Sequence, residues 1–181
     1  MVRKINTVLT LLVMLLLLDH MIFGGLYLFG IGNGVIAILA GSMLVLILLH
    51  ALISMAVTIR AEIAGFKTKA RYKKENREFW QRRVSGMFIL VLGLLHVFMT
   101  GKNEQGIPRI AFLPKIFYAA NPALICFIYW HILSNIRPLL ISLGIRNIDN
   151  KQRIIKIVLT VVTLFALIAN LQVIVSHMGG H

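Results

Sequence analysis

The sequence predicts an all-α membrane protein with five transmembrane helices in a single domain that spans residues 1–181. Three observations predict this class. The chain is 59% hydrophobic and its mean hydropathy is +0.86, above the usual range of soluble domains. Several apolar stretches are long enough to cross about 30 Å of hydrocarbon. Their periodicity is helical or absent, and no alternating pattern indicates a β-barrel.

The places where apolar runs begin and end define the five expected spans. The first run follows Arg3 and Lys4 but is too long for a signal peptide and carries Asp19, so we expect a mature helix. The third helix is expected to start nearer Phe79 than its purely apolar stretch indicates. In chain order the spans are Asn6–Phe29, Val35–Ile59, Val84–Met99, Leu113–Leu143 and Ile154–Val175.

The segments between the spans are short and polar or rich in glycine. Gly30–Gly34 is typical of a turn between helices, Gly101–Pro108 of a polar loop, and only Ala61–Glu78 is expected to form a long loop. The single cysteine, Cys126, excludes an internal disulfide and a thiolate metal cluster. We expect it to be a small, buried, apolar residue.

Basic residues are concentrated in alternate connections, and this sets the predicted orientation. The chain has 19 Lys and Arg against 6 Asp and Glu. Arg60–Arg83 holds nine basic and three acidic residues, and Arg137–Lys156 holds five and one. The positive-inside rule therefore places the N-terminus and both segments in the cytoplasm, and the C-terminus outside the inner (cytoplasmic) membrane of the cell. The excess charge indicates topology rather than nucleic-acid binding, although a basic face suits an acidic protein or anionic lipid.

Four histidines lie in four different apolar spans: His20, His50, His96 and His131. A polar side chain in lipid is costly, so each needs a partner or a function. By helical rise, His20 and His96 lie about 21 and 20 Å from the inner surface, and His50 and His131 about 15 and 9 Å. The histidines thus form an outer pair, His20 with His96, and an inner pair, His50 with His131.

Two histidine levels, each supplied by two helices, predict a four-helix core that binds two stacked haems, with the fifth helix packed outside it. Gly24 and Gly93 would let a porphyrin approach the backbone near the outer pair. Ser134 follows His131 at helical spacing, and Arg60 and Arg137 close the inner end, where haem carboxylates need cations. His177 and His181 lie at the outer end and in the tail and are not counted as ligands.

Other interpretations of the same residues remain open. Membrane histidines also form interhelical hydrogen bonds or proton relays, so a proton-coupled transporter that uses the histidines and Asp19 is one alternative. Another is a haem-b subunit of a different redox complex, such as a hydrogenase or formate dehydrogenase. Glycine and serine near the histidines can also serve plain helix packing.

Three segments resemble the cytochrome b membrane-anchor subunits of succinate:quinone oxidoreductases and quinol:fumarate reductases, of the five-helix, two-haem kind. LLHALISMAVTIR resembles their second helix with His50 as ligand. EFWQRRVSGMFILVLGLLHVFMTG resembles the aromatic-Q-x-x-[ST]-G opening of a later helix, with Ser85 in the motif and His96 as ligand. CFIYWHILSNIRPLL resembles the helix that carries the fourth ligand, here His131, although Asn135 replaces a glycine.

The resemblance implies an electron-transferring subunit with two haem b groups and a membrane quinone, expected to be menaquinone, as substrate. It implies flavoprotein and iron–sulfur subunits on the cytoplasmic face, with succinate oxidation or fumarate reduction in those subunits. Residues expected to contact the haems are the four histidines together with Arg60, Ser85, Ser134 and Arg137. Some family members carry glutamates near the first helix junction and two residues before the fourth ligand. Here those places hold Gly30–Gly34 and Tyr129.

Asp19 is the only acidic residue deep in a predicted span, about 20 Å from the inner surface by helical rise. It adjoins His20, so it points about 100° away from that ligand. We expect it to exchange protons with a quinol beside the outer haem. The alternative is that it bonds a neighbouring helix or a haem propionate. Asn170 and His177, one heptad apart, are expected to add polar contacts to the quinone.

Overall fold

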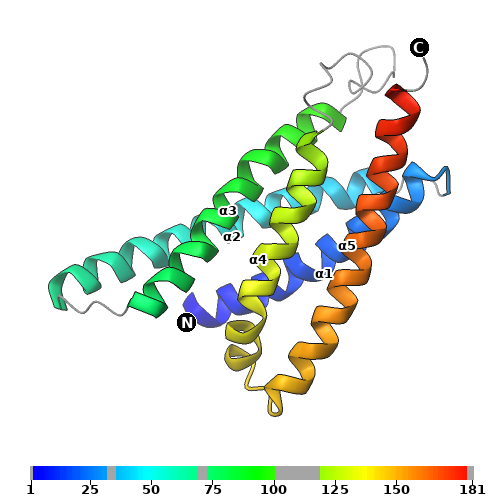
Figure 1. Ribbon diagram of the computed structural model, residues 1–181. Helices are drawn as coiled ribbons and strands as arrows, with labels where there is room; N and C mark the ends of the chain where they lie inside the picture. Colours follow the sequence, from blue (N-terminus) through cyan, green and yellow to red (C-terminus); the bar gives the residue numbers. More distant parts are fainter. Residues whose placement is uncertain (1, 32–35, 69–72, 101–118, 179–181) are drawn as a thin grey trace.

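The computed structural model describes residues 2–31, 36–68, 73–100 and 119–178, and this part of the chain is helical apart from short turns. The helices are α1 (Val2–Leu28), α2 (Ile36–Thr68), α3 (Lys73–Thr100), α4 (Ala120–Ser142) and α5 (Ile148–Met178) (Figure 1). Each contains a stretch that is long and apolar enough to cross a membrane. Helices suit such segments because hydrocarbon offers no partners for backbone N–H and C=O groups. In the described part of the chain, the structure thus confirms an all-helical fold with five helices long and apolar enough to cross a membrane, which is consistent with a multi-pass membrane protein.

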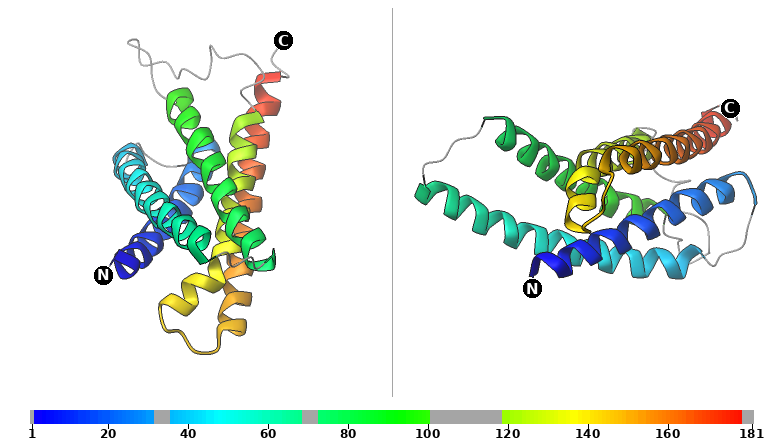
Figure 2. Two further views of the ribbon diagram at one scale, coloured as in Figure 1. Left: turned by 90° about the vertical axis from the view of Figure 1, so that its left-hand side faces the viewer. Right: turned by 90° about the horizontal axis from the view of Figure 1, so that it is seen from below.

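Most helices that follow one another in the chain pack together, and successive helices run in opposite directions. The starts of α1, α3 and α5 lie toward one end of the molecule, and the ends of α2 and α4 lie there too (Figure 1). The best-packed pairs are α3 with α4, α1 with α2, α4 with α5 and α1 with α5, whereas α2 meets α3 over a short stretch only. The two further views show α2 standing away from α4 and α5 (Figure 2).

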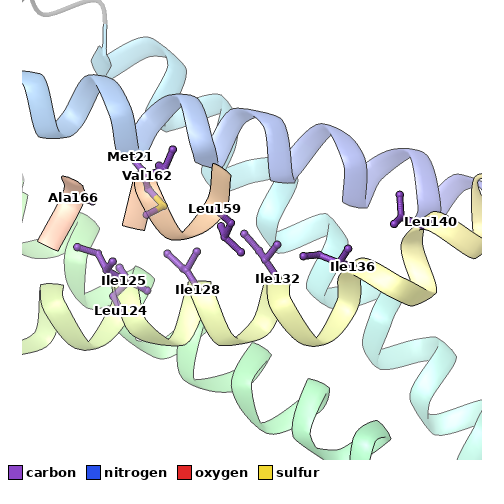
Figure 3. Packing of buried hydrophobic residues seen from close by; sticks show 10 residues of the cluster. All are labelled: Met21, Leu124, Ile125, Ile128, Ile132, Ile136, Leu140, Leu159, Val162 and Ala166. Atoms are coloured by element: carbon purple, nitrogen blue, oxygen red, sulfur yellow. The ribbon is translucent and has the colours of Figure 1, made fainter. Parts of the chain in front are cut away.

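The buried core lies where α4, α5 and α1 meet. Leu124, Ile128, Ile132, Ile136 and Leu140 recur every four residues along α4 and form one continuous stripe. The stripe points toward Leu159 and Val162 of α5 and Met21 of α1 (Figure 3). Ala166 and Ala169 of α5 are 4% and 0% exposed, so small side chains allow α5 to pack closely here. Lipid tails are as apolar as leucine, so this close fit, rather than escape from water, holds the helices together.

The expectation that the fifth helix packs outside a four-helix core is wrong. α5 supplies part of the buried cluster, while α2 supplies none of its buried members in the described part of the chain. The reason is shape: α4 and α5 carry matching branched and small residues, which pack tightly. The apolar side chains of α2, such as Leu52 and Ile59, remain largely exposed, and hydrocarbon accepts them at no cost.

Glycines with positive φ end two of the helices. At the end of α1, Gly30 has φ +78° and the Ile31 N–H donates to the Leu26 carbonyl at 3.0 Å. At the end of α4, Gly144 has φ +70° and the Ile145 N–H donates to the Leu140 carbonyl at 3.1 Å. Both are Schellman motifs, which require a left-handed residue that glycine adopts without strain. The tight turn after Gly144 brings α5 back alongside α4.

Several sequence predictions need correction. The long loop expected over Ala61–Glu78 is mostly helix, because α2 continues to Thr68 and α3 begins at Lys73. Good helix formers such as Ala, Glu and Lys carry both helices past the apolar stretch. The described part of the fourth helix begins at Ala120, two residues before Pro122, which a first turn tolerates. The predicted start at Leu113 lies outside the described residues. Cys126 is exposed on α4 rather than buried, because it lies off the core-facing stripe. Residues 101–118 and most of the predicted Gly30–Gly34 turn lie outside the described residues.

The packing of α1 on α5 predicts a specific steric effect at Gly25. A Cβ added there would lie 2.5 Å from Cε1 of Phe165. We expect Gly25→Ala to lower the free energy of unfolding by about 1–3 kcal/mol, the usual cost of overpacking. Thermal unfolding in detergent measures it. In a Phe165→Ala background the ring is gone, so the same substitution should cost nothing further; equal losses in both backgrounds would contradict this packing.

Candidate functional site

The outer histidine pair is in direct contact. His20 of α1 and His96 of α3 are both half-buried. Their ring centroids are 6.1 Å apart, and the ring planes stand at 87° to each other. The depth argument predicted that these two residues lie at one level, and the structure brings them together. The contact joins α1 with α3.

The inner pair is looser. His50 of α2 and His131 of α4 are half-buried and lie within electrostatic range of each other. Arg83 of α3 is within the same range of both rings. The inner level therefore combines two imidazoles with one guanidinium, supplied by three helices.

Three of the four histidines are held through Nδ1 by a residue of a neighbouring helix. His131 Nδ1 lies 2.9 Å from Oγ of Ser85, which is 1% exposed. His96 Nδ1 lies 3.0 Å from Oδ1 of Asn121. His50 Nδ1 lies 3.3 Å from Oγ1 of Thr10. These bonds connect α3 with α4 twice and α1 with α2 once.

The partners favour one position for the ring proton. The Ser85 hydroxyl lies 3.2 Å from the Arg82 carbonyl and the Thr10 hydroxyl 2.7 Å from the Asn6 carbonyl, so each can donate its hydrogen there. The two hydroxyl oxygens can then accept from the Nδ1–H of His131 and His50. Oδ1 of Asn121 is a carbonyl oxygen, so it can only accept. This arrangement favours the tautomer with the proton on Nδ1 and the lone pair on Nε2, in which an imidazole binds a metal.

Glycines shape the space around the histidines in two ways. A Cβ at Gly86 would lie 3.3 Å from Cε1 of His131, so the missing side chain lets this ring lie against α3. At Gly24 and Gly93 an added Cβ would meet nothing within 4 Å. Open space therefore adjoins the outer pair one helical turn from each histidine.

The donor set and its spacing fit a haem at the outer pair. Two imidazoles that bind one metal from opposite sides, each about 2 Å from it, have ring centroids roughly 6 Å apart. The 6.1 Å between His20 and His96 agrees with this. If a haem bound at this level, His20 and His96 could each supply one imidazole nitrogen to its iron. Open space at Gly24 and Gly93 is consistent with a porphyrin edge.

The other predicted site residues have varied surroundings. Ser85 bonds His131 itself, and Ser134 Oγ donates to the His131 backbone carbonyl within α4. Arg60 and Arg137 are exposed near the ends of α2 and α4. Asp19 is half-buried and interacts electrostatically with His20.

The predicted polar contacts on α5 are only partly described. Asn170 donates from Nδ2 to the Ala166 carbonyl of its own helix, 2.9 Å away. The side chain of His177 and the whole of His181 lie outside the described residues. The hydrogen bond of Asn170 therefore stays within its own helix.

The sequence argument missed three residues of the site. Thr10 and Asn121 hold histidines, but a threonine or asparagine in a span gives no signal of its partner. Arg83 was treated as the boundary of a span, yet it lies beside the inner pair with its guanidinium 4.9 Å from the Phe79 ring. Its Nε is buried and has no hydrogen-bond partner among the described residues. A cation in this position is a candidate binding group for an anion at the inner level.

Comparison of the chain with protein-family models, with curated proteins and with solved structures gives no match. The function proposed below therefore depends on the contacts of the four histidines and on the sequence segments that surround them.

Proposed function

We propose that this protein is a di-haem cytochrome b membrane anchor that passes electrons between an iron–sulfur subunit and a membrane quinone, in a complex of the succinate dehydrogenase or fumarate reductase type. The observation that carries the proposal is the outer pair: two imidazoles from different helices, 6.1 Å apart, beside open space. The Nδ1 hydrogen bonds of His50, His96 and His131 support it, because with the ring proton on Nδ1 the lone pair lies on Nε2, the nitrogen that would bind a metal.

The proposed roles follow from position. His20 and His96 would bind the outer haem, and His50 and His131 the inner haem. When bound, each haem supplies a one-electron carrier whose potential depends on its axial ligands and surroundings. Arg83, beside the inner pair, is the best-placed cation for a haem propionate. Arg60 and Arg137 are exposed at the same end and have side chains long enough to add to it.

The proposed orientation places the N-terminus in the cytoplasm and the C-terminus outside. The ends of α2 and α4 and the starts of α3 and α5 lie toward one end of the molecule (Figure 1). The basic segments Arg60–Arg83 and Arg137–Lys156 therefore converge on this face. We propose that this face binds the iron–sulfur subunit, which in turn carries the flavoprotein, and that menaquinone is the membrane substrate.

The haem assignment makes a pairwise prediction. The purified chain should show a reduced-minus-oxidised spectrum of b type with two haems, both low-spin and six-coordinate. Alanine at His50 or His131 should remove the inner haem, and alanine at His20 or His96 the outer one, because each haem needs both ligands. Haem content and electron paramagnetic resonance of the four variants measure this.

His177→Ala serves as the control for these variants and should keep both haems. Loss of haem in any other pairing would overturn the assignment of ligands. A wild-type chain with no haem, expressed with haem available, would favour the proton-coupled transporter instead. Identification of the co-purifying subunits separates a dicarboxylate-linked complex from a hydrogenase or formate dehydrogenase.

The proposed docking face can be tested on α5, where the basic side chains are described. Lys151, Arg153 and Lys156 are exposed near the start of this helix. Reversal of charge at Arg153 and Lys156 should weaken assembly with the iron–sulfur subunit, and the loss should grow as salt is lowered. Co-purification at several salt concentrations measures it. Asp149→Asn removes a negative charge from the same region and should leave assembly intact. If this variant weakens assembly as much as the charge reversals do, the loss is not caused by weaker electrostatic attraction.

Asp19 is proposed to exchange protons with the quinone beside the outer haem. Its half-buried position next to His20 places a proton carrier near that level. Asp19→Asn keeps the size of the side chain but removes the exchangeable proton. We expect quinone-linked turnover to fall about 10²–10⁴-fold, the usual contribution of a positioned acid or base, with both haems retained. Unchanged turnover would exclude the proton role, and loss of the outer haem would assign Asp19 to its binding.

A further inference from the structure

Three polar residues that the histidine motif alone does not identify contact the histidines from neighbouring helices. Ser85 of α3 bonds His131 of α4, Asn121 of α4 bonds His96 of α3, and Thr10 of α1 bonds His50 of α2. Each contact is to Nδ1, never to the helix backbone of the histidine. The same geometry therefore occurs three times with three different residue types.

Other hydroxyl and amide side chains near the histidines behave differently. Ser134 and Asn135 both bond the backbone carbonyl of His131, and Thr58 bonds the Ser54 carbonyl of its own helix. These bonds satisfy a polar group locally, as is usual for such residues inside a helix. They place no constraint on an imidazole ring. The contrast distinguishes residues that bond an imidazole ring from residues whose polar group bonds only a carbonyl of their own helix.

We infer that Ser85, Thr10 and Asn121 are positioning residues that hold His131, His50 and His96 in the Nδ1–H tautomer and aim Nε2 at the metal. The inference rests on the proposed haem function but concerns different residues. Ser85 is the strongest case, because its oxygen is buried and its own hydrogen is already donated to the Arg82 carbonyl. Gly86 completes the arrangement by giving the His131 ring room against α3.

Support for the histidines is unequal between the two levels. Both inner histidines have an acceptor for Nδ1–H. At the outer level His96 has one, while Nδ1 of His20 is buried with no hydrogen-bond partner among the described residues. Removal of Ser85 or Thr10 should therefore change the inner haem, and removal of Asn121 the outer one. Acceptors of this kind raise the basicity of the ligand, and their loss typically lowers metal affinity 10–100-fold.

The test compares Ser85→Ala with Asn135→Ala. Both substitutions remove one polar group within hydrogen-bond distance of His131, but only Ser85 bonds its ring, whereas Asn135 bonds its backbone carbonyl. We expect Ser85→Ala to release the inner haem 10–100-fold more readily than wild type. The midpoint potential of the remaining inner haem should rise, because a less basic imidazole stabilises the oxidised iron less. Asn135→Ala should match wild type in both measurements, and Ser85→Thr, which keeps the hydroxyl, should restore the wild-type potential.

A second measurement needs no haem. In haem-free protein with ¹⁵N-labelled histidine, the nitrogen resonances should show His131 protonated on Nδ1 in the wild type and in Asn135→Ala. In Ser85→Ala this preference should be lost. Thr10→Val with Thr58→Val as its control repeats the comparison for His50, since valine keeps the shape and removes the hydroxyl.

The outcomes distinguish the two proposals. A wild-type chain that binds no haem would overturn the proposed function, while the nitrogen resonances would still decide whether Ser85 holds His131. If the wild type binds two haems and Ser85→Ala equals Asn135→Ala in haem release and potential, the positioning role is wrong and the ligand assignment stands.

Discussion

The packing of α4 between α3 and α5 is the constraint on which the rest of the structure depends. One face of α4 carries the isoleucine and leucine stripe that meets α5 and α1. Another face carries Asn121, Phe127 and His131 toward α3, where Phe127 stacks on Phe88 with ring centroids 4.5 Å apart. A rotation of α4 by one residue, about 100°, would lose both sets of contacts at once. The apolar stripe thus sets the rotation of the helix, and the rotation of the helix sets where His131 and Asn121 point.

The polar groups of the bundle follow from the same environment. Hydrocarbon provides no hydrogen bonds, so a buried hydroxyl, amide or imidazole needs a partner within the protein. Most described serine and threonine side chains bond a carbonyl of their own helix. A smaller set bonds across helices, including Tyr129 of α4 and Thr160 of α5 with their oxygens 3.2 Å apart. Three of the cross-helix bonds end on a histidine, so contacts that hold helices together also hold the rings.

The two histidine levels differ in the charge beside them. The inner pair has Arg83 within electrostatic range, and the outer pair has the carboxylate of Asp19. Charges in a medium of low dielectric act over longer distances than in water. The four histidines therefore lie in two chemically different surroundings. The inner pair has a neighbouring guanidinium and two rings bonded at Nδ1, and the outer pair has a neighbouring carboxyl group and one ring bonded at Nδ1.

By itself, the sequence determined which apolar segments form the five long helices of the described part of the chain, the alternation of basic connections and the position of each histidine along its helix. These properties depend on hydropathy and on the fixed rise of a helix, which are local. The pairing of His20 with His96 followed because helical rise converts position in the chain into depth. The ends of the helices were harder to predict. α2 and α3 extend into the basic segment because its residues still favour helix, although they are no longer apolar.

Only the tertiary structure decided which helices form the core and which side chains meet across it. That α5 belongs to the core depends on how Ala166 and Ala169 fit the stripe on α4, a property of two surfaces together. Likewise Thr10 and His50 are 40 residues apart, and Ser85 and His131 are 46 apart. Depth constrains where such residues lie along the membrane normal, but not how each helix is rotated about its axis. Rotation is set by side-chain packing over the whole interface, so the partners of the histidines emerge only when the helices are packed.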